Sequence, residues 1–184
     1  MWHNKALLKA QLFAWLLAKE RLPTKHNLVK KTIVASDLCD ICRAASETAS
    51  HICFLCPFAR QFWMTIGIDP LIYDVRQLGR LRPNGNLPEL HHQVFYLLCL
   101  WALWNHRHDV VFCNLDASVP AAISKCVDEC SLWSERLKPP DRAVVSIWKG
   151  IFSSPLQLFM SCNLSCNPYS IYLMQFRWGT SPLR

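Results

Sequence analysis

Four residues in one short stretch of the chain have the types and spacing of a metal site. Cys39 and Cys42 are separated by two residues, His51 follows after eight more and Cys56 after another four, which gives the pattern C-x2-C-x8-H-x4-C. Structural zinc is bound tetrahedrally by sets such as three cysteines and one histidine. Four protein ligands close the coordination shell and leave no position for a reactive water. The spacing therefore predicts one structural zinc site.

A second set of ligands fits the same stretch. Cys39, Cys42, Cys53 and Cys56 give the pattern C-x2-C-x10-C-x2-C, which resembles a ribbon-like site of four cysteines and leaves His51 free. Clustered cysteines can also be buried as small hydrophobic residues that bind no metal. Spacing alone leaves the choice between His51 and Cys53 open.

Positive charge is concentrated at the start of the chain. The formal net charge is +7, and residues 1–31 hold seven Lys or Arg against Glu20 alone, a balance of +6. Such a block can bind a polyanion through phosphate contacts and counterion release, or it can be a solvated helix face. The candidate nucleic-acid contacts are Lys9, Lys19, Arg21, Lys25, Lys30 and Lys31.

The candidate metal ligands lie in a predicted loop between helices. Apolar residues recur at helical spacing from Ala6 to Ala18, and this pattern predicts a helix with a broad buried face. Thr24 is placed to cap a short second helix that ends at Lys30 or Lys31, and Pro57 suits the first turn of a helix that ends near Gly67. The face expected to be buried on the first helix contains Leu7, Leu8, Leu12, Phe13, Trp15 and Leu16.

The rest of the chain is predicted to be helical up to its last part. Gly, Pro, Asn and Arg residues favour a linker with a hinge at 69–88, a long helix spans about 89–114, and Ser118 caps another helix that Pro139 and Pro140 stop. Beyond Lys149 neither helical nor strand periodicity is present. The prediction is a zinc-binding domain at 1–68, a linker at 69–88, a helical extension at 89–149 and an irregular or disordered tail at 150–184. The expected fold class is mainly α, with helices around a small zinc knuckle and a C-terminal helical pair.

Two further groups of chemically active residues have simpler interpretations. The four residues from His106 to Asp109 close a strongly apolar helix, and an exposed polar end is the expectation for them. Cys126 and Cys130 lie in an apolar helical stripe, where core packing is the expectation. The sequence contains no G-x-S-x-G and only 5 glycines, without a glycine-rich loop for phosphate. The chain is therefore predicted not to be an enzyme.

The composition indicates an intracellular protein without a membrane partner. The longest nearly continuous apolar run, Val94 to Trp104, is 11 residues, whereas a membrane-spanning helix needs ~20. Lysines interrupt the first apolar segment, which argues against a secretory signal. In a reducing compartment, closely spaced residues among the ten cysteines indicate metal binding rather than disulfides.

Several short motifs occur in a fixed order around the candidate ligands. They are Phe13-Ala-Trp15-Leu-Leu, Arg21-Leu-Pro-Thr24-Lys-His-Asn-Leu28, Cys39-Asp-Ile-Cys42, Glu47-Thr, His51-Ile-Cys-Phe-Leu-Cys56-Pro-Phe-Ala and Trp63. In order and spacing they resemble the zinc-binding domain that follows the polymerase region of plant non-LTR (LINE-type) retrotransposon reverse transcriptases. The helix from Leu100 to Phe112 is similar to a signature helix that often follows this domain, although Arg107-His108 stands where those elements have Arg-Asn.

The resemblance has consequences for ligands and partners. It implies that Cys39, Cys42, His51 and Cys56 bind zinc, because Cys53 occupies a position that is usually apolar or aromatic in that family. It also implies contact with RNA or DNA, or with the parent reverse transcriptase region. Polymerase activity is not implied, because the chain contains no Tyr-x-Asp-Asp. A structural or protein-interaction remnant without nucleic-acid affinity is the alternative, based on an apolar fraction of 52% against 18% charged residues.

Overall fold

The fold is an assembly of helices, as predicted. The computed structural model describes residue 6 and residues 8–165. In this part of the chain no β-strand is present, and one isolated antiparallel bridge joins Leu38 to Ser46. The helical elements are α1 (Leu8–Ala18), α2 (Lys25–Lys30), the π-turn η1 (His51–Leu55), α3 (Pro57–Thr65), the 3-10 turn η2 (Val75–Arg80), α4 (His92–Phe112), α5 (Val119–Ser134), the 3-10 turn η3 (Pro139–Asp141) and α6 (Ala143–Ser165).

Local sequence signals determine where three helices begin. The Thr24 hydroxyl accepts a hydrogen bond from the Asn27 amide at 3.4 Å and so caps α2, and the Ser118 hydroxyl accepts one from the Ala121 amide at 3.3 Å at the start of α5. Pro57 occupies the first turn of α3, where its missing N–H costs no hydrogen bond. All three starts were predicted from residue type alone.

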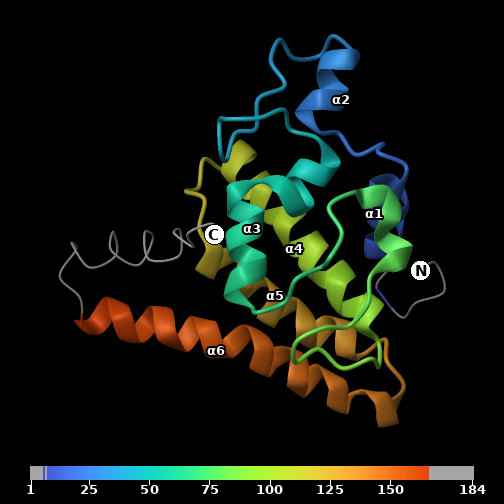
Figure 1. Ribbon diagram of the computed structural model, residues 1–184, viewed down its shortest axis with the longest axis vertical. Helices are drawn as coiled ribbons and strands as arrows, with labels where there is room; N and C mark the ends of the chain where they lie inside the picture. The colour runs from blue at the N-terminus through green and yellow to red at the C-terminus, as the bar shows by residue number, and fades with distance from the viewer. Residues whose placement is uncertain (1–5, 7, 166–184) are drawn as a thin grey trace, which may run out of the picture.

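The long helix α4 connects the two ends of the molecule. Figure 1 shows α2 and the loop that follows it at one end, α6 along the other and α4 between them. Near the start of α4, Phe95 stacks on Phe152 of α6 at 5.2 Å and meets Trp148 at 5.9 Å. Every residue of α4 from Val94 to Leu100 is buried, which accounts for the continuous apolar run in this part of the helix. Among the described helices, none is long and apolar enough to cross a bilayer.

The buried face of α1 differs from the prediction. Leu8, Leu12 and Trp15 were expected in the core, but their exposed fractions are 71%, 59% and 40%. Phe13 is buried as predicted, together with Ala10, Ala14 and Leu17, and Leu7 lies outside the described residues. Helix α1 packs against both η2 and α4, and Phe13 meets Trp101 of α4 edge-on at 5.3 Å. Apolar residues occur on all faces of α1. The periodicity of the sequence alone therefore gave the wrong burial for Leu8, Leu12 and Trp15.

The segment predicted as a hinge, 69–88, is packed into the structure. Val75 and Leu78 of η2 are buried, and η2 lies against α1. The Val75 amide donates a hydrogen bond to the Ser50 hydroxyl at 3.1 Å, and the Tyr96 hydroxyl of α4 donates one to the Arg82 carbonyl at 3.0 Å. Glycine and proline therefore shape turns here rather than giving a free spacer. The division into a zinc-binding domain at 1–68 and a helical extension at 89–149 stays a prediction.

The prediction of an irregular tail from residue 150 is wrong for its first part. Helix α6 continues to Ser165, although it contains Gly150 and Pro155. These two residues obscured the helical pattern in the sequence, whereas burial of Trp148 and Phe152 against α4 holds the helix in place. The remainder of the predicted tail, residues 166–184, lies outside the described residues.

The contact between α6 and α4 is expected to contribute strongly to stability. Phe152 is fully buried against Phe95, so Phe152→Ala should lower the free energy of unfolding by about 3–5 kcal/mol. Urea denaturation followed by circular dichroism measures this change. Leu158→Ala in the same helix is the control, because Leu158 is 69% exposed and should cost below about 1 kcal/mol. Equal effects of the two substitutions would contradict the packing of α6.

Candidate metal centre

The structure brings together the histidine-containing set of candidate ligands. The ligand atoms of Cys39, Cys42, His51 and Cys56 all lie within 4.8 Å of one another. The Cys42 sulfur is 3.3 Å from Nε2 of His51, which identifies Nε2 as the ring nitrogen that faces the sulfurs. Cys39, His51 and Cys56 are buried, and Cys42 is partly exposed. Among the described residues, these four form the one group of three or more histidine, cysteine or acidic side chains that lie close enough together to hold a metal ion.

A tight loop presents the first two cysteines. The Cys39 amide donates to the Ala45 carbonyl at 2.9 Å, and the Arg43 amide donates to the Cys39 carbonyl at 2.8 Å. Arg43 adopts a left-handed backbone conformation with φ of 53°, which reverses the chain immediately after Cys42. The backbone amides of Ile41 and Cys42 donate hydrogen bonds to the Cys39 sulfur. The loop therefore supplies both sulfurs and also the donors that stabilise negative charge on one of them.

A π-turn presents the other two ligands. In η1 the Cys56 amide donates to the His51 carbonyl at 2.7 Å, a hydrogen bond that spans five residues instead of the four of an α-helix. This hydrogen bond brings the backbone of Cys56 back onto that of His51, whereas an α-helix rotates residues five apart by about 140° from each other. Cys56 then precedes α3, and the Phe58 amide donates to its sulfur. One local distortion thus aligns His51 with Cys56.

Cys53 is not part of this group. It lies in the same π-turn with an exposed fraction of 2%, and burial raises the pKa of its thiol, which keeps the thiol neutral. Its backbone carbonyl accepts a hydrogen bond from the indole N–H of Trp63 at 2.8 Å. The structure therefore assembles the set with His51 and not the set with four cysteines. Cys53 packs as a small hydrophobic residue.

The geometry and charge of the cluster fit a zinc ion. Tetrahedral zinc with Zn–S of ~2.3 Å and Zn–N of ~2.0 Å places its ligand atoms about 3.5–3.8 Å apart, close to the 3.3 Å between Cys42 and His51. A hydrogen bond from the Cys56 thiol lowers the pKa of Cys39, and the same contact raises the pKa of Cys56. Two neighbouring sulfurs that share one proton form a donor set for a divalent cation, which displaces thiol protons when it binds.

The N-terminal part of the chain is similar to a known protein family. Residues 1–63 match the family described as zinc-binding in reverse transcriptase. The matched stretch contains all four clustered residues and supports a reverse transcriptase zinc-binding domain in this part of the chain. The match ends within α3, so η2 and the helices from α4 onwards lie beyond it. No curated protein and no solved structure matched the chain.

A buried ion pair joins the matched region to α4. Glu47, in the loop between Cys42 and His51, is 0% exposed, and Arg107 of α4 is 2% exposed. The guanidinium of Arg107 donates to both carboxylate oxygens of Glu47, at 2.7 Å from Nη2 and 3.3 Å from Nε. A two-point contact of this kind fixes orientation as well as distance. The loop that carries the candidate ligands is therefore attached to a helix outside the matched region.

Glu47 also holds the start of α2. Its carboxylate accepts a hydrogen bond from the Lys25 amide at 2.9 Å, and its backbone carbonyl accepts one from the His26 amide at 3.3 Å. The expectation of an exposed polar end at His106–Asp109 is thus wrong for Arg107, and also for His106, which is 2% exposed and accepts a hydrogen bond from the Ser118 amide. Glu47 is a charged residue within the motifs, but its partner lies 60 residues away, and no local signal connects the two.

The six candidate nucleic-acid contacts have different surroundings. Lys25 is bound to Asp40 at 2.5 Å, and Lys9 lies over the Trp101 ring at 5.4 Å. Lys19 is exposed on the surface. Arg21, Lys30 and Lys31 line one hollow together with Trp15. Three of the six predicted contacts, Arg21, Lys30 and Lys31, therefore lie around the same hollow.

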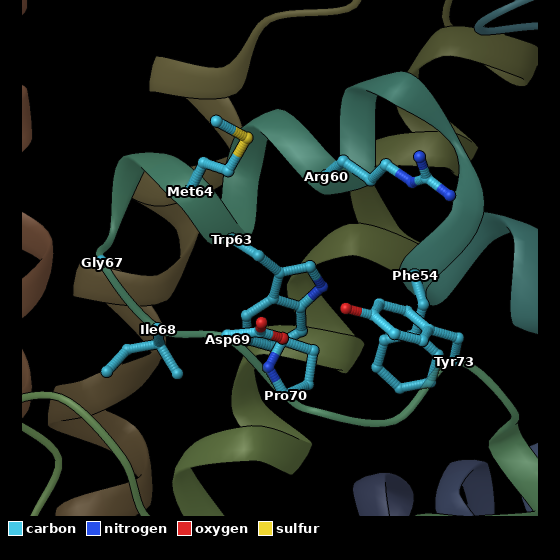
Figure 2. A pocket seen from close by; sticks show the side chains of 9 residues that line it. All are labelled: Phe54, Arg60, Trp63, Met64, Gly67, Ile68, Asp69, Pro70 and Tyr73. Carbon is cyan, nitrogen blue, oxygen red and sulfur yellow. The ribbon is translucent and has the colours of Figure 1, made fainter. Parts of the chain in front are cut away.

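A second hollow lies beside η1 and α3. Its volume is about 550 Å³, and Figure 2 shows the rings of Phe54, Trp63 and Tyr73 around it with Arg60 at its edge. The residues that line it include one carboxylate, Asp69, and no histidine, cysteine or serine. The lining of this hollow therefore contains neither a serine–histidine nor a cysteine–histidine pair.

The remaining described cysteines that are buried have a structural role. Cys99, Cys126 and Cys130 are 0% exposed, between α4 and α5. Burial raises the pKa of Cys130 to about 12 and raises that of Cys99 as well. Neutral, inaccessible thiols are unreactive and pack as hydrophobic side chains. Core packing of Cys126 and Cys130 is thus confirmed.

Proposed function

We propose that Cys39, Cys42, His51 and Cys56 bind one structural zinc ion in a non-catalytic module that contacts RNA or DNA. The grouping of the four ligand atoms within 4.8 Å supports the metal site, and the match of residues 1–63 supports a module of the kind found in reverse transcriptases. Four protein ligands leave zinc no open position for catalysis. We also propose that this module originates from a plant LINE-type retrotransposon. This part of the proposal rests on the resemblance of the motifs.

One observation carries the nucleic-acid part of the proposal. Arg21, Lys30 and Lys31 line the same hollow, and within the described part of the chain none of them forms an ion pair with a carboxylate. The loop with the candidate zinc ligands positions these cations, because Glu47 and Asp40 hold the start of α2 through Lys25. Clustered cations without acidic partners are available to phosphate groups.

Neutralising these cations is expected to weaken nucleic-acid binding and its salt dependence. Each phosphate contact contributes about 0.7–0.9 to the slope of log affinity against log salt. The triple substitution Arg21→Gln, Lys30→Gln and Lys31→Gln should therefore lower the magnitude of that slope by about 2–3. Fluorescence anisotropy with a labelled oligonucleotide in a salt series measures the slope.

A matched control separates local contacts from net charge. Arg80, Arg136 and Lys138 are exposed and lie outside the hollow, so changing these three to glutamine removes the same charge elsewhere. We expect this control to retain most of the affinity. An equal loss in both triple variants, or absence of binding by the unaltered chain at low salt, would contradict the proposed contact.

A protein-interaction module is the second candidate, and the exposed face of α1 favours it. Leu8 and Leu12 are 71% and 59% exposed and lie one helical turn apart. An exposed apolar stripe is a common feature of surfaces that pack against another protein. If the chain self-associates in size-exclusion chromatography, if Leu8→Gln with Leu12→Gln abolishes that association, and if nucleic-acid affinity is absent, this second function is the correct one.

A further inference from the structure

The hollow beside α1 combines an aromatic ring with positive charge. Its volume is about 530 Å³, within the ~300–1,000 Å³ that small-molecule sites occupy. Trp15 lies in it with 40% of its surface exposed, although indole rings are usually buried to a greater extent. The charged groups around it are Arg21, Lys30 and Lys31 against Glu20, a balance of +2.

The hollow is built by hydrogen bonds rather than by loosely placed side chains. The side-chain amide of Asn27 donates to the carbonyls of Glu20 at 2.7 Å and Leu22 at 2.9 Å, which fixes the turn between α1 and α2. The Arg21 amide donates to the Leu16 carbonyl at 2.8 Å. The Arg21 guanidinium then lies 5.9 Å from the centre of the Trp15 ring. The aromatic platform and the nearest cation are therefore held together before any ligand binds.

We infer that this hollow binds an unpaired stretch of nucleic acid, with a base stacked on Trp15 and phosphates on Arg21, Lys30 and Lys31. The inference rests on the proposed function and narrows its substrate class to single strands. Phosphate contacts do not distinguish paired from unpaired strands. A base within a duplex is already stacked on its neighbours, so an exposed indole gains stacking energy only from an unpaired base.

Replacement of Trp15 in the full-length chain tests this inference. Removal of an aromatic side chain on which a base stacks lowers the affinity for single strands by roughly 5- to 150-fold. We expect Trp15→Ala to show that loss with both oligouridine and oligothymidine, and Trp15→Phe to retain part of the affinity. Affinity for a duplex of the same length should change by less than about twofold. Leu12→Ala is the control, because Leu12 is exposed on the same helix but does not line the hollow.

Each outcome of this experiment has a defined meaning. An unchanged affinity of Trp15→Ala for single strands, or equal weakening for single strands and duplex, overturns the inference. Competition by polyglutamate as strong as that by oligouridine also overturns it, because the hollow would then accept any polyanion. If the unaltered chain binds neither strand type at low salt, the proposed function itself fails. Zinc content of Trp15→Ala should equal that of the unaltered chain, since Trp15 lies outside the cluster of candidate ligands.

Discussion

Cys39→Ser and His51→Ala are each expected to abolish stoichiometric zinc in the purified protein and to unfold the region around the metal. Structural zinc supplies about 10–16 kcal/mol of apparent binding free energy in zinc-finger peptides near neutral pH, whereas a whole domain is stable by about 5–15 kcal/mol. A zinc ion would join the loop of Cys39 directly to the turn of His51, because it takes ligands from both. Loss of the ion should therefore lower the melting temperature markedly, and a chelator should reproduce the effect in the unaltered chain.

Cys53→Ala is the matched control for these two substitutions. Cys53 has the same residue type as the ligands and lies in the same turn, but it is not part of the cluster. We expect this variant to retain one zinc per chain, with only the modest destabilisation caused by a small cavity. Metal analysis of the three variants, together with thermal unfolding, makes the comparison. Retained zinc in His51→Ala with loss of zinc in Cys53→Ala would establish the four-cysteine set instead.

Arg107→Met is expected to lower the free energy of unfolding by about 3–5 kcal/mol, because it leaves the fully buried Glu47 carboxylate without its countercharge. Replacing both partners, with Glu47→Gln and Arg107→Met, should cost less than the sum of the two single changes. A double-mutant cycle measured by urea denaturation gives this coupling. Zinc retention should also weaken in Arg107→Met, since Glu47 holds the loop that carries the ligands.

An exposed ion pair provides the comparison for this second prediction. Arg142 lies 3.1 Å from Glu135, and their side chains are 41% and 68% exposed. Arg142→Met should cost no more than about 1 kcal/mol, because water screens a pair at the surface. Similar costs for Arg107→Met and Arg142→Met would contradict a structural role for the buried pair. A large difference would show that α4 belongs to the same folding unit as the candidate zinc site.

Residue types and short spacings predicted the local features well. Thr24, Ser118 and Pro57 each act within one helical turn, so their caps and starts follow from local chemistry. The spacing of Cys39 and Cys42 likewise determines how the loop presents two sulfurs. The choice between His51 and Cys53 depends on a π-turn, and nothing in the residue types distinguishes this turn from an ordinary α-helical turn.

Features that depend on distant contacts could not be predicted in the same way. Glu47 and Arg107 meet across 60 residues of sequence, and each alone has the pattern of a surface charge. The buried face of α1 is decided by its packing against η2 and α4 rather than by its periodicity. Helix α6 is held by packing of Phe152 against α4, which outweighs the unfavourable Gly150 and Pro155.

X-ray absorption spectroscopy of the full-length chain, combined with metal analysis, tests the central claim most directly. The arrangement of Cys39, Cys42, His51 and Cys56 predicts one zinc per chain with three sulfur ligands at ~2.3 Å and one nitrogen ligand at ~2.0 Å. A shell of four sulfurs at stoichiometric zinc would assign the fourth position to Cys53. Purified, folded protein that holds no zinc and takes up none from solution would contradict the metal site altogether.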